Sequence, residues 1–353
     1  MLMTRRIFLA GSGAALGMAL GLPQKAVADD RPLFASAWID GERAGFAVLD
    51  RDGAILKSLP LPGRGHDVTI DHERGRLVAF ARRPGNFAVA IDRANMDAPV
   101  AFTSPEDRHF YGHGCFSPDG RLLYATENDF DNARGIIGIY DASDGFRRIG
   151  EFYSHGIGPH DVLAMPGGKI LCIANGGIET HPDYGRAMLN LDHMEPSIVF
   201  LDRETGALIE KHELPSQLSR LSTRHMDIDA DGTVWIGCQY QGEITDNPPL
   251  ILSVAPGEAH RTVMLPDTMQ ASLGGYIGSV AANREAGTLA VTSPHGNSVI
   301  VLDTATGNPL SHDTLADVCG VAPDRAGFLL SNGEGRFGTS RHDCVWDNHI
   351  AVL

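Results

Sequence analysis

The sequence has few cysteines and no motif for a covalently bound cofactor. Its five cysteines are Cys115, Cys172, Cys238, Cys319 and Cys344. None of them forms a CxxC or CxxCH motif, which argues against a zinc ribbon and against covalently attached haem. Cys172 and Cys238 lie in apolar strand patterns and are interpreted as small core residues. Pairing of Cys319 with Cys344 remains open from the sequence.

Positive charge is also scarce. The chain has 29 Lys and Arg residues against 44 Asp and Glu residues, for a net charge of −15 at pH 7. Because no basic cluster occurs beyond the N-terminal region, we expect no nucleic-acid partner. The sequence lacks a GxSxG motif, and its glycine-rich segments lack the strand–turn–helix context of a phosphate-binding loop. No nucleotide cofactor is therefore expected.

The N-terminus has the order of an export signal. Arg5 and Arg6 precede an uncharged stretch (residues 11–22) and an Ala-Val-Ala cleavage motif that ends at Ala28. The adjacent arginines resemble the twin-arginine consensus, whose route exports folded proteins. The apolar stretch is shorter than the roughly 20 residues that a bilayer span needs. We therefore predict a twin-arginine signal peptide over residues 1–28, a periplasmic location and no membrane span after signal removal.

Residues 29–353 are predicted to form one domain that is built from a repeat. Short apolar or alternating runs recur between turn residues, and four such runs make one unit. The first run of three successive units carries a histidine at positions 66, 113 and 160, a spacing of 47 residues. Four-stranded units with a period of about 40–50 residues are typical of β-propeller blades.

The two ends of the chain complete the count of blades. Residues 33–61 supply three strands without an inner strand, and residues 348–353 supply an inner strand with nothing after it. Joined, these segments make one further blade and leave no open sheet edge. We therefore predict an all-β, seven-bladed β-propeller of the YVTN or WD40 type, closed by its N- and C-terminal strands, and we expect a monomer.

One position of the repeat carries histidine in five of the seven units. These residues are His66, His113, His160, His225 and His349. Because inner strands line the central channel, equivalent positions are expected at one height, at one mouth of the channel. Neutral imidazoles bind Fe, Cu, Zn or Ni, so we predict a transition-metal site there. Histidines at a repeat position also hydrogen-bond between blades in WD-type propellers, and this alternative stays open.

Acidic residues near the ring of histidines are expected to orient the imidazoles. The candidates are Asp67, Glu127, Asp161 and Asp227. The long connection over residues 175–196 is expected to fold over the channel face as a lid, since long loops in compact domains are often functional. It contributes two further candidates, His181 and Asp183. The histidines expected at the surface are His72, His109, His155, His212, His260, His312 and His342.

Several motifs resemble those of a family of exported bacterial propellers that is classified as a domain of unknown function. They are the twin-arginine start, the inner-strand motifs Gly-His-Asp, Gly-His-Gly and Pro-His-Asp, and the terminal Trp346-Asp347-Asn348-His349. Members are often encoded beside imelysin-type peptidase-like proteins and a di-haem thiol-oxidoreductase-like protein, a neighbourhood linked to iron uptake. The resemblance implies a role in iron or copper handling, with periplasmic iron-uptake proteins as partners. It brings no catalytic residues.

Three classes of function are compatible with the sequence. The first is transition-metal binding at the channel mouth in the service of metal acquisition. The second is a metal-dependent enzyme, either an oxidoreductase or a lactonase-like hydrolase that uses Glu127 and Asp183. Lactonase-type propellers favour acidic and amide ligands over histidine, which counts against the hydrolase. The third is a metal-free scaffold that docks a partner protein on the same face.

Overall fold

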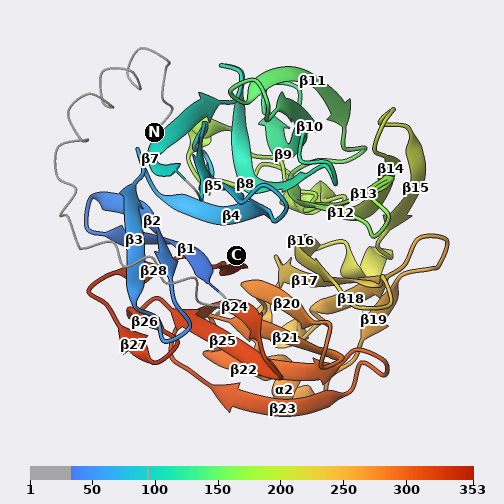
Figure 1. Ribbon diagram of the computed structural model, residues 1–353. Helices are drawn as coiled ribbons and strands as arrows, with labels where there is room; N and C mark the ends of the chain where they lie inside the picture. The colour runs from blue at the N-terminus through green and yellow to red at the C-terminus, as the bar shows by residue number, and fades with distance from the viewer. Residues whose placement is uncertain (1–32, 94) are drawn as a thin grey trace.

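The predicted seven-bladed β-propeller is confirmed. The computed structural model describes residues 33–93 and 95–353, and seven antiparallel sheets surround a central axis, with the C-terminus close to that axis (Figure 1). The predicted signal peptide lies outside the described residues. None of the helices that the structure describes is long and apolar enough to cross a membrane.

Six blades follow one another along the chain, each with four strands in the order inner to outer. Blade 1 comprises β4 (Gly65–Asp71), β5 (Arg76–Ala81), β6 (Phe87–Asp92) and β7 (Asn95–Thr103). Blade 2 comprises β8 (Arg108–Phe116), β9 (Leu122–Asp129), β10 (Arg134–Asp141) and β11 (Arg147–Tyr153). Blade 3 comprises β12 (Pro159–Ala164), β13 (Ile170–Asn175), β14 (Ser197–Asp202) and β15 (Leu208–Glu213).

The next three blades repeat this order. Blade 4 comprises β16 (Leu221–Ile228), β17 (Val234–Tyr240), β18 (Ile251–Val254) and β19 (Arg261–Val263). Blade 5 comprises β20 (Ser279–Asn283), β21 (Thr288–Ser293), β22 (Ser298–Asp303) and β23 (Pro309–Thr314). Blade 6 comprises β24 (Val318–Asp324), β25 (Gly327–Asn332), β26 (Arg336–Phe337) and β27 (Ser340–Arg341).

Blade 7 joins the two ends of the described chain, as predicted. Its strands are β1 (Phe34–Asp40), β2 (Arg43–Leu49), β3 (Ile55–Pro60), β28 (Val345–Trp346) and β29 (Ala351–Val352). Both β28 and β29 pair antiparallel with β1. The single C-terminal strand expected over residues 348–353 is instead two short strands, because the chain leaves the ladder between them. This closure removes the open edges that a sheet would otherwise present.

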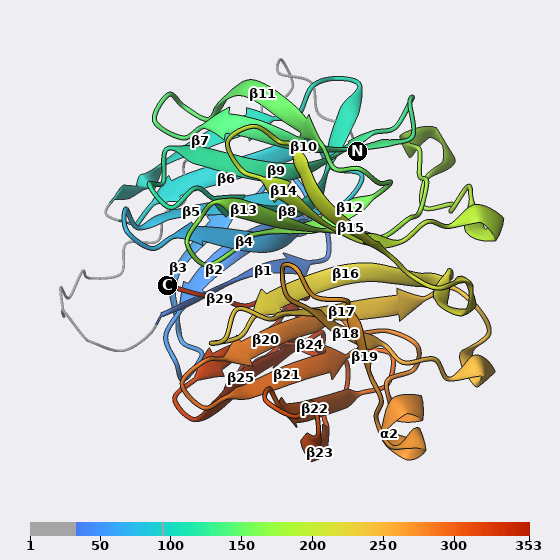
Figure 2. The same cartoon turned by 90° about the vertical axis from the view of Figure 1, so that its right-hand side faces the viewer.

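The helical segments within residues 33–93 and 95–353 lie in connections. They are the short α-helix α2 (Asp267–Ser272) and the 3₁₀ turns η1 (Pro182–Tyr184), η2 (Leu191–His193), η3 (Ser216–Leu218) and η4 (Ile244–Asp246). Figure 2 shows α2 and the other coiled ribbons on one side of the ring. We call this side the loop face. The predicted lid, which carries η1 and η2, belongs to it.

Apolar side chains fill the spaces between neighbouring blades. The middle strands are buried almost throughout, as in β13 and β17, whereas the outer strand β11 alternates exposed and half-buried residues. Continuous burial is expected for strands that are covered on both faces. Cys172 and Cys238 are fully buried, which confirms their assignment to the core. All five cysteines are free thiols, including Cys319 and Cys344.

His109 corrects one prediction, because it is buried rather than exposed. Strand β8 begins at Arg108, earlier than its sequence motif, and this places His109 inside blade 2. Its Nδ1 donates to the Phe110 carbonyl at 3.0 Å, and its Nε2 accepts from the Asn128 amide at 3.0 Å. Burial lowers the pKa of His109 to about 4. Its ring is therefore neutral in the folded protein at neutral pH.

This burial predicts a loss of stability in mild acid. Below pH 6.5 the unfolded chain binds a proton at this position, whereas the folded chain does so only near pH 4. Stability is therefore highest above pH 6.5 and falls as the pH is lowered. We expect His109→Gln to reduce the stability lost between pH 6.5 and pH 5 by about 2 kcal/mol, measured by urea denaturation. His72→Gln, at an exposed position, is the control; an equal pH dependence in both variants would contradict the assignment.

Candidate metal centre

The five histidines of the repeat position meet in the central channel. Neighbouring ring centroids are 4.6 Å apart for His225 and His349, 4.7 Å for His160 and His225, and 4.8 Å for His66 and His113. His66, His113 and His225 are each at most 4% exposed. The imidazoles therefore converge and pack against one another below the surface. We call these five residues the histidine cluster.

Breaks in strand pairing help to position the cluster. The inner strands β4, β8, β12 and β16 each lose regular register with their second strand at or beside the histidine. A bulge of this kind re-aims a side chain that regular alternation would send to a sheet face. Blade 6 has the same break without a histidine, so the bulge belongs to the repeat. The inner strand of blade 5, which carries Ser279 at this position, pairs regularly.

Gly112 makes room for two of the imidazoles to approach each other. It has a φ of +108°, and a Cβ at this position would lie 2.6 Å from Cδ2 of His66. Glycine alone adopts this backbone conformation at low cost and leaves the space free. The first glycine of the Gly-His-Gly motif therefore allows His66 to pack beside His113.

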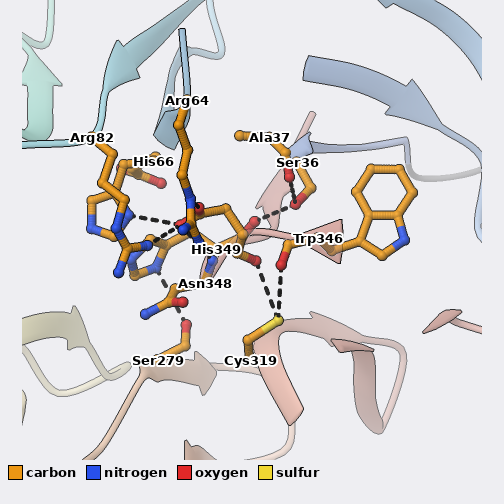
Figure 3. A network of polar contacts seen from close by, with 12 residues as sticks. Ser36, Ala37, Arg64, His66, Arg82, Ser279, Cys319, Trp346, Asn348 and His349 are labelled. Carbon is orange, nitrogen blue, oxygen red and sulfur yellow. Dashed lines mark hydrogen bonds and ion pairs between the residues drawn. The ribbon is translucent and has the colours of Figure 1, made fainter. Parts of the chain in front are cut away.

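A buried carboxylate fixes the orientation of His66. Oδ1 of Asp347 lies 2.9 Å from Nδ1 of His66, and the same carboxylate accepts hydrogen bonds from Arg64 at 2.7 Å and from Arg82 at 2.8 Å. Burial opposes the charge on Asp347, but Arg82, His66 and Arg64 outweigh it and hold the pKa of this carboxyl well below its usual range. Figure 3 shows His66 and His349 close together, with Arg64 and Arg82 beside them.

A second carboxylate acts on His113 in the same way. Oδ2 of Asp67 lies 3.3 Å from Nδ1 of His113, and Oδ1 of Asp161 lies 3.6 Å from it. Burial alone would lower the pKa of His113, but Asp161 and Asp67 outweigh it and raise that pKa. At His349, the Ser279 hydroxyl lies 3.4 Å from Nδ1. An acceptor at Nδ1 keeps the proton there and leaves the lone pair on Nε2.

Five other ring nitrogens of the cluster have no hydrogen-bond partner. These buried atoms are Nε2 of His113, His160 and His349 and both ring nitrogens of His225. An unsatisfied buried polar atom costs about 1–3 kcal/mol, so several in one place call for a ligand. Two groups of three have candidate donor atoms within 4.8 Å of one another: His66, His113 and His160, and His113, His225 and His349.

Burial keeps four of the imidazoles neutral. It lowers the pKa of His66 to about 3, although the hydrogen bond that His66 donates to Asp347 acts in the opposite direction. It also lowers the pKa well below the ordinary value in His160, His225 and His349. A neutral imidazole keeps a lone pair and is a metal ligand, whereas an imidazolium is not. Four of the five imidazoles are therefore deprotonated ligands at neutral pH, whereas the raised pKa of His113 favours its protonated form, so that a metal binding there displaces a proton.

The remaining acidic candidates and His181 lie in other environments. Glu127 accepts from the Tyr140 hydroxyl at 2.6 Å and pairs with Arg148 at 2.8 Å. Asp227 accepts from the backbone of Ala282 at 2.8 Å and pairs with Arg284 at 2.9 Å, and so joins blade 4 to blade 5. Nδ1 of His181 caps η1 by accepting from the Asp183 backbone N–H, and Asp183 is exposed. Among the described contacts of these four residues, none is with the histidine cluster.

A pocket connects the cluster with the loop face. His66 and His160 line it, and the segment predicted as a lid contributes Ile178 and Arg186. The pocket has about 550 Å³ of empty space, including its open mouth. A small ion or molecule could therefore reach two of the imidazoles through it. The sequence predicted neither this pocket nor Asp347. Asp347 lies two residues before His349, whereas Asp67, Asp161 and Asp227 each lie one or two residues after a cluster histidine.

Asp67 offers a direct test of the carboxylate contacts. We expect Asp67→Ala to weaken transition-metal binding by roughly 10- to 100-fold, because His113 would lose the acceptor that orients it. Isothermal titration of the metal-free protein measures this change. Asp183→Ala is the matched control, since that carboxylate is exposed and has no described contact with the cluster. Equal affinities in the two variants would show that the Asp67 contact does not support metal binding.

Comparison with solved structures identifies the fold alone. A chain of hydrazine synthase from Kuenenia stuttgartiensis matches with a TM-score of 0.63 at 13% identity, covering 94% of this chain and 99% of that one. The β-propeller domain of Cps50 (Swd1) from Myceliophteria thermophila matches with a TM-score of 0.60 at 8% identity, with the same coverage of each chain. At these identities, no ligand or activity can be transferred.

Sequence comparison places the chain more specifically. Comparison with the curated proteins found no match. A family model described as "Protein of unknown function (DUF1513)" matches residues 59–353, which include six complete blades, the C-terminal strands of blade 7 and all five histidines of the cluster. The chain therefore belongs to the DUF1513 family.

Proposed function

We propose that this protein is an exported periplasmic β-propeller that binds a transition-metal ion, iron or copper, through the histidine cluster and serves metal acquisition. The observation that carries the proposal is the set of buried ring nitrogens without partners in His113, His160, His225 and His349. Candidate donor atoms of two groups of three cluster histidines lie within 4.8 Å of one another. Asp347, Asp67 and Ser279 contact Nδ1 of His66, His113 and His349, respectively.

The chemistry of the donors supports a transition metal. Imidazole suits Fe, Cu, Zn and Ni, whereas Mg²⁺ and Ca²⁺ prefer oxygen ligands. The thiols of Cys115, Cys172 and Cys238 are buried, and burial raises their pKa, so that they stay protonated and are poor metal ligands. Iron and copper are the preferred candidates because the family resemblance points to iron or copper handling.

The spacing of the donors is close to what an ion requires. Two ligands at about 2.1 Å from one ion, at angles near 90–110°, are roughly 3–3.4 Å apart. The candidate donor atoms of each group lie within 4.8 Å of one another. Side-chain rotations that move each ring by about 1 Å toward the centre would suffice. The bulged inner strands leave the cluster without a regular ladder at that level, which allows such adjustments.

The closure of the ring supports export of a finished fold. Blade 7 contains the last strands of the chain, β28 and β29, paired with β1. Asp347, between those two strands, fixes His66 of blade 1. The cluster therefore forms only once the whole chain has been made, and the twin-arginine route that we propose for this protein carries folded cargo.

Uptake of labelled metal by the native host tests the role in acquisition. A deletion strain should accumulate less ⁵⁵Fe or ⁶⁴Cu under metal limitation, and the wild-type gene should restore uptake. A gene that encodes His113→Ala with His160→Ala should fail to restore it, whereas His72→Ala with His260→Ala, outside the cluster, should succeed. Restoration by the cluster variant to the wild-type level would refute a role of the cluster in metal acquisition.

A further inference from the structure

Four arginines surround the pocket above the histidine cluster. They are Arg82, Arg83, Arg186 and Arg224. Arg82 pairs with the buried Asp347, which also binds Arg64. The other three form no hydrogen bond or ion pair with a residue in the described ranges 33–93 and 95–353. The pocket therefore has an excess of positive charge, in a chain whose net charge is −15.

Arg224 shows most clearly that this charge lacks a partner. It directly precedes His225 on β16, and its Nε is buried without a hydrogen-bond partner. Burial and the nearby Arg83 and Arg82 lower its pKa to about 10, which still leaves it charged at neutral pH. Burying a cation beside other cations is costly unless an anion compensates it. The protein maintains this arrangement in a pocket that His66 and His160 also line.

The lining of the pocket indicates the kind of anion. Guanidinium groups match carboxylate and phosphate oxygens in bidentate geometry. Tyr276 and Tyr111 also line the pocket, and the Tyr276 hydroxyl accepts from Asn348 at 2.8 Å, which leaves its own proton free to donate to a ligand. About 50 Å³ of the pocket is open to the centre of a water molecule, which suits a small ion or molecule rather than a macromolecule.

We propose that this pocket binds a small multivalent oxyanion, through carboxylate or phosphate oxygens, directly above the histidine cluster. Bound there, the anion lies beside His66 and His160, where its oxygens can complete the coordination of an ion held by imidazoles. Binding of the anion together with the metal rests on the function proposed above and specifies the form in which the metal binds. The arginines then have two roles: they neutralise the anion, and they select metal that arrives with an oxyanion.

Calorimetric titration of the metal-free mature protein with citrate and with inorganic phosphate, at low chloride, tests the inference. We expect at least one of the two to bind, and Arg224→Gln to weaken that binding by roughly 10- to 100-fold, as expected for loss of a hydrogen bond to a charged group. Arg121→Gln, at an exposed turn position, is the control and should bind like the wild type. Without an anion, Arg224→Gln should unfold at the same temperature as the wild type or higher, because repulsion is relieved.

The outcomes separate the two sources of the anion and the two proposals. Binding of citrate alone identifies a carboxylate ligand, and binding of phosphate alone identifies a phosphate ligand. Binding of neither, or unweakened binding by Arg224→Gln, overturns the anion pocket. A separate titration with Fe²⁺ or Cu²⁺ in the absence of either anion tests the histidine cluster. Anion binding without metal binding would support the anion pocket and refute the metal site. Metal binding without anion binding would support the metal site and refute the anion pocket.

Discussion

Replacing His113 and His160 together by alanine is expected to weaken transition-metal binding by at least 100-fold and to lower the bound metal from about one ion per chain to near zero. Both groups of three histidines that lie within 4.8 Å share His113, and one of them also contains His160. The double variant therefore leaves neither group intact. Elemental analysis after equilibrium dialysis against Fe²⁺ or Cu²⁺ measures the occupancy.

Nε2 of both histidines lacks a hydrogen-bond partner in the wild-type channel, and the substitutions remove only the Nδ1 contacts of His113 with Asp67 and Asp161. We expect the double variant still to fold. A denaturant titration checks this, and His72→Ala with His260→Ala serves as the control for the loss of two histidines outside the cluster. Unchanged occupancy in the His113 and His160 variant would place the metal elsewhere. Absence of metal from the wild type would leave the cluster as a structural feature that ordered water satisfies.

Asp347→Ala is expected to destabilise the protein by about 3 kcal/mol. The Asp347 side chain is 2% exposed, and it pairs with Arg64, Arg82 and His66 across the boundary between blade 7 and blade 1. Removing one partner of a buried ion pair leaves the others uncompensated, which typically costs about 3–5 kcal/mol. The lower end applies because Arg64 is 39% exposed and can turn toward water.

The free energy of unfolding from urea denaturation measures this effect. Asp343→Ala provides a control four residues earlier in the same closing segment, at an exposed position, and should change stability by less than about 0.5 kcal/mol. A loss below 1 kcal/mol in Asp347→Ala would show that this network does not hold the ring closed. It would also remove the reason to regard Asp347 as the residue that orients His66.

The repeat made the architecture predictable. Four runs per unit, at spacings close to those of known blades, indicated seven blades, and the missing inner strand at residues 33–61 indicated closure by the C-terminus. Both follow from local patterns, because strand alternation and turn residues act over a few positions. The pairing of β1 with β28 and β29 confirms the closure.

The candidate site was predictable only in part. A shared repeat position was enough to bring the five histidines together, since equivalent positions of successive blades face the same channel. Their partners depend on contacts between blades, which the pattern within a blade does not encode. Asp67 reaches His113 of the next blade, whereas Asp227, at the equivalent place, binds the backbone of blade 5. Glu127 forms an ion pair with Arg148 inside blade 2 instead of contacting a cluster histidine.

The arginine-lined pocket shows the same limit more strongly. Arg82 follows the second strand of blade 1, Arg186 lies in the long connection of blade 3, and Arg224 belongs to the inner strand of blade 4. These residues are far apart in the sequence, and the net charge of −15 gives no indication of a positively charged pocket. Only the circular arrangement of blades brings them to one mouth. Function on such a scaffold depends on side chains that meet across blades.

Anomalous diffraction from crystals of the protein purified from its native host, recorded on both sides of the iron and copper absorption edges, tests the central claim most directly. The account predicts one anomalous peak within the histidine cluster, with at least three imidazole nitrogens at about 2.0–2.3 Å and His113 among them. Channel density that shows no anomalous signal at either edge, or a metal bound only by residues outside the cluster, would contradict it.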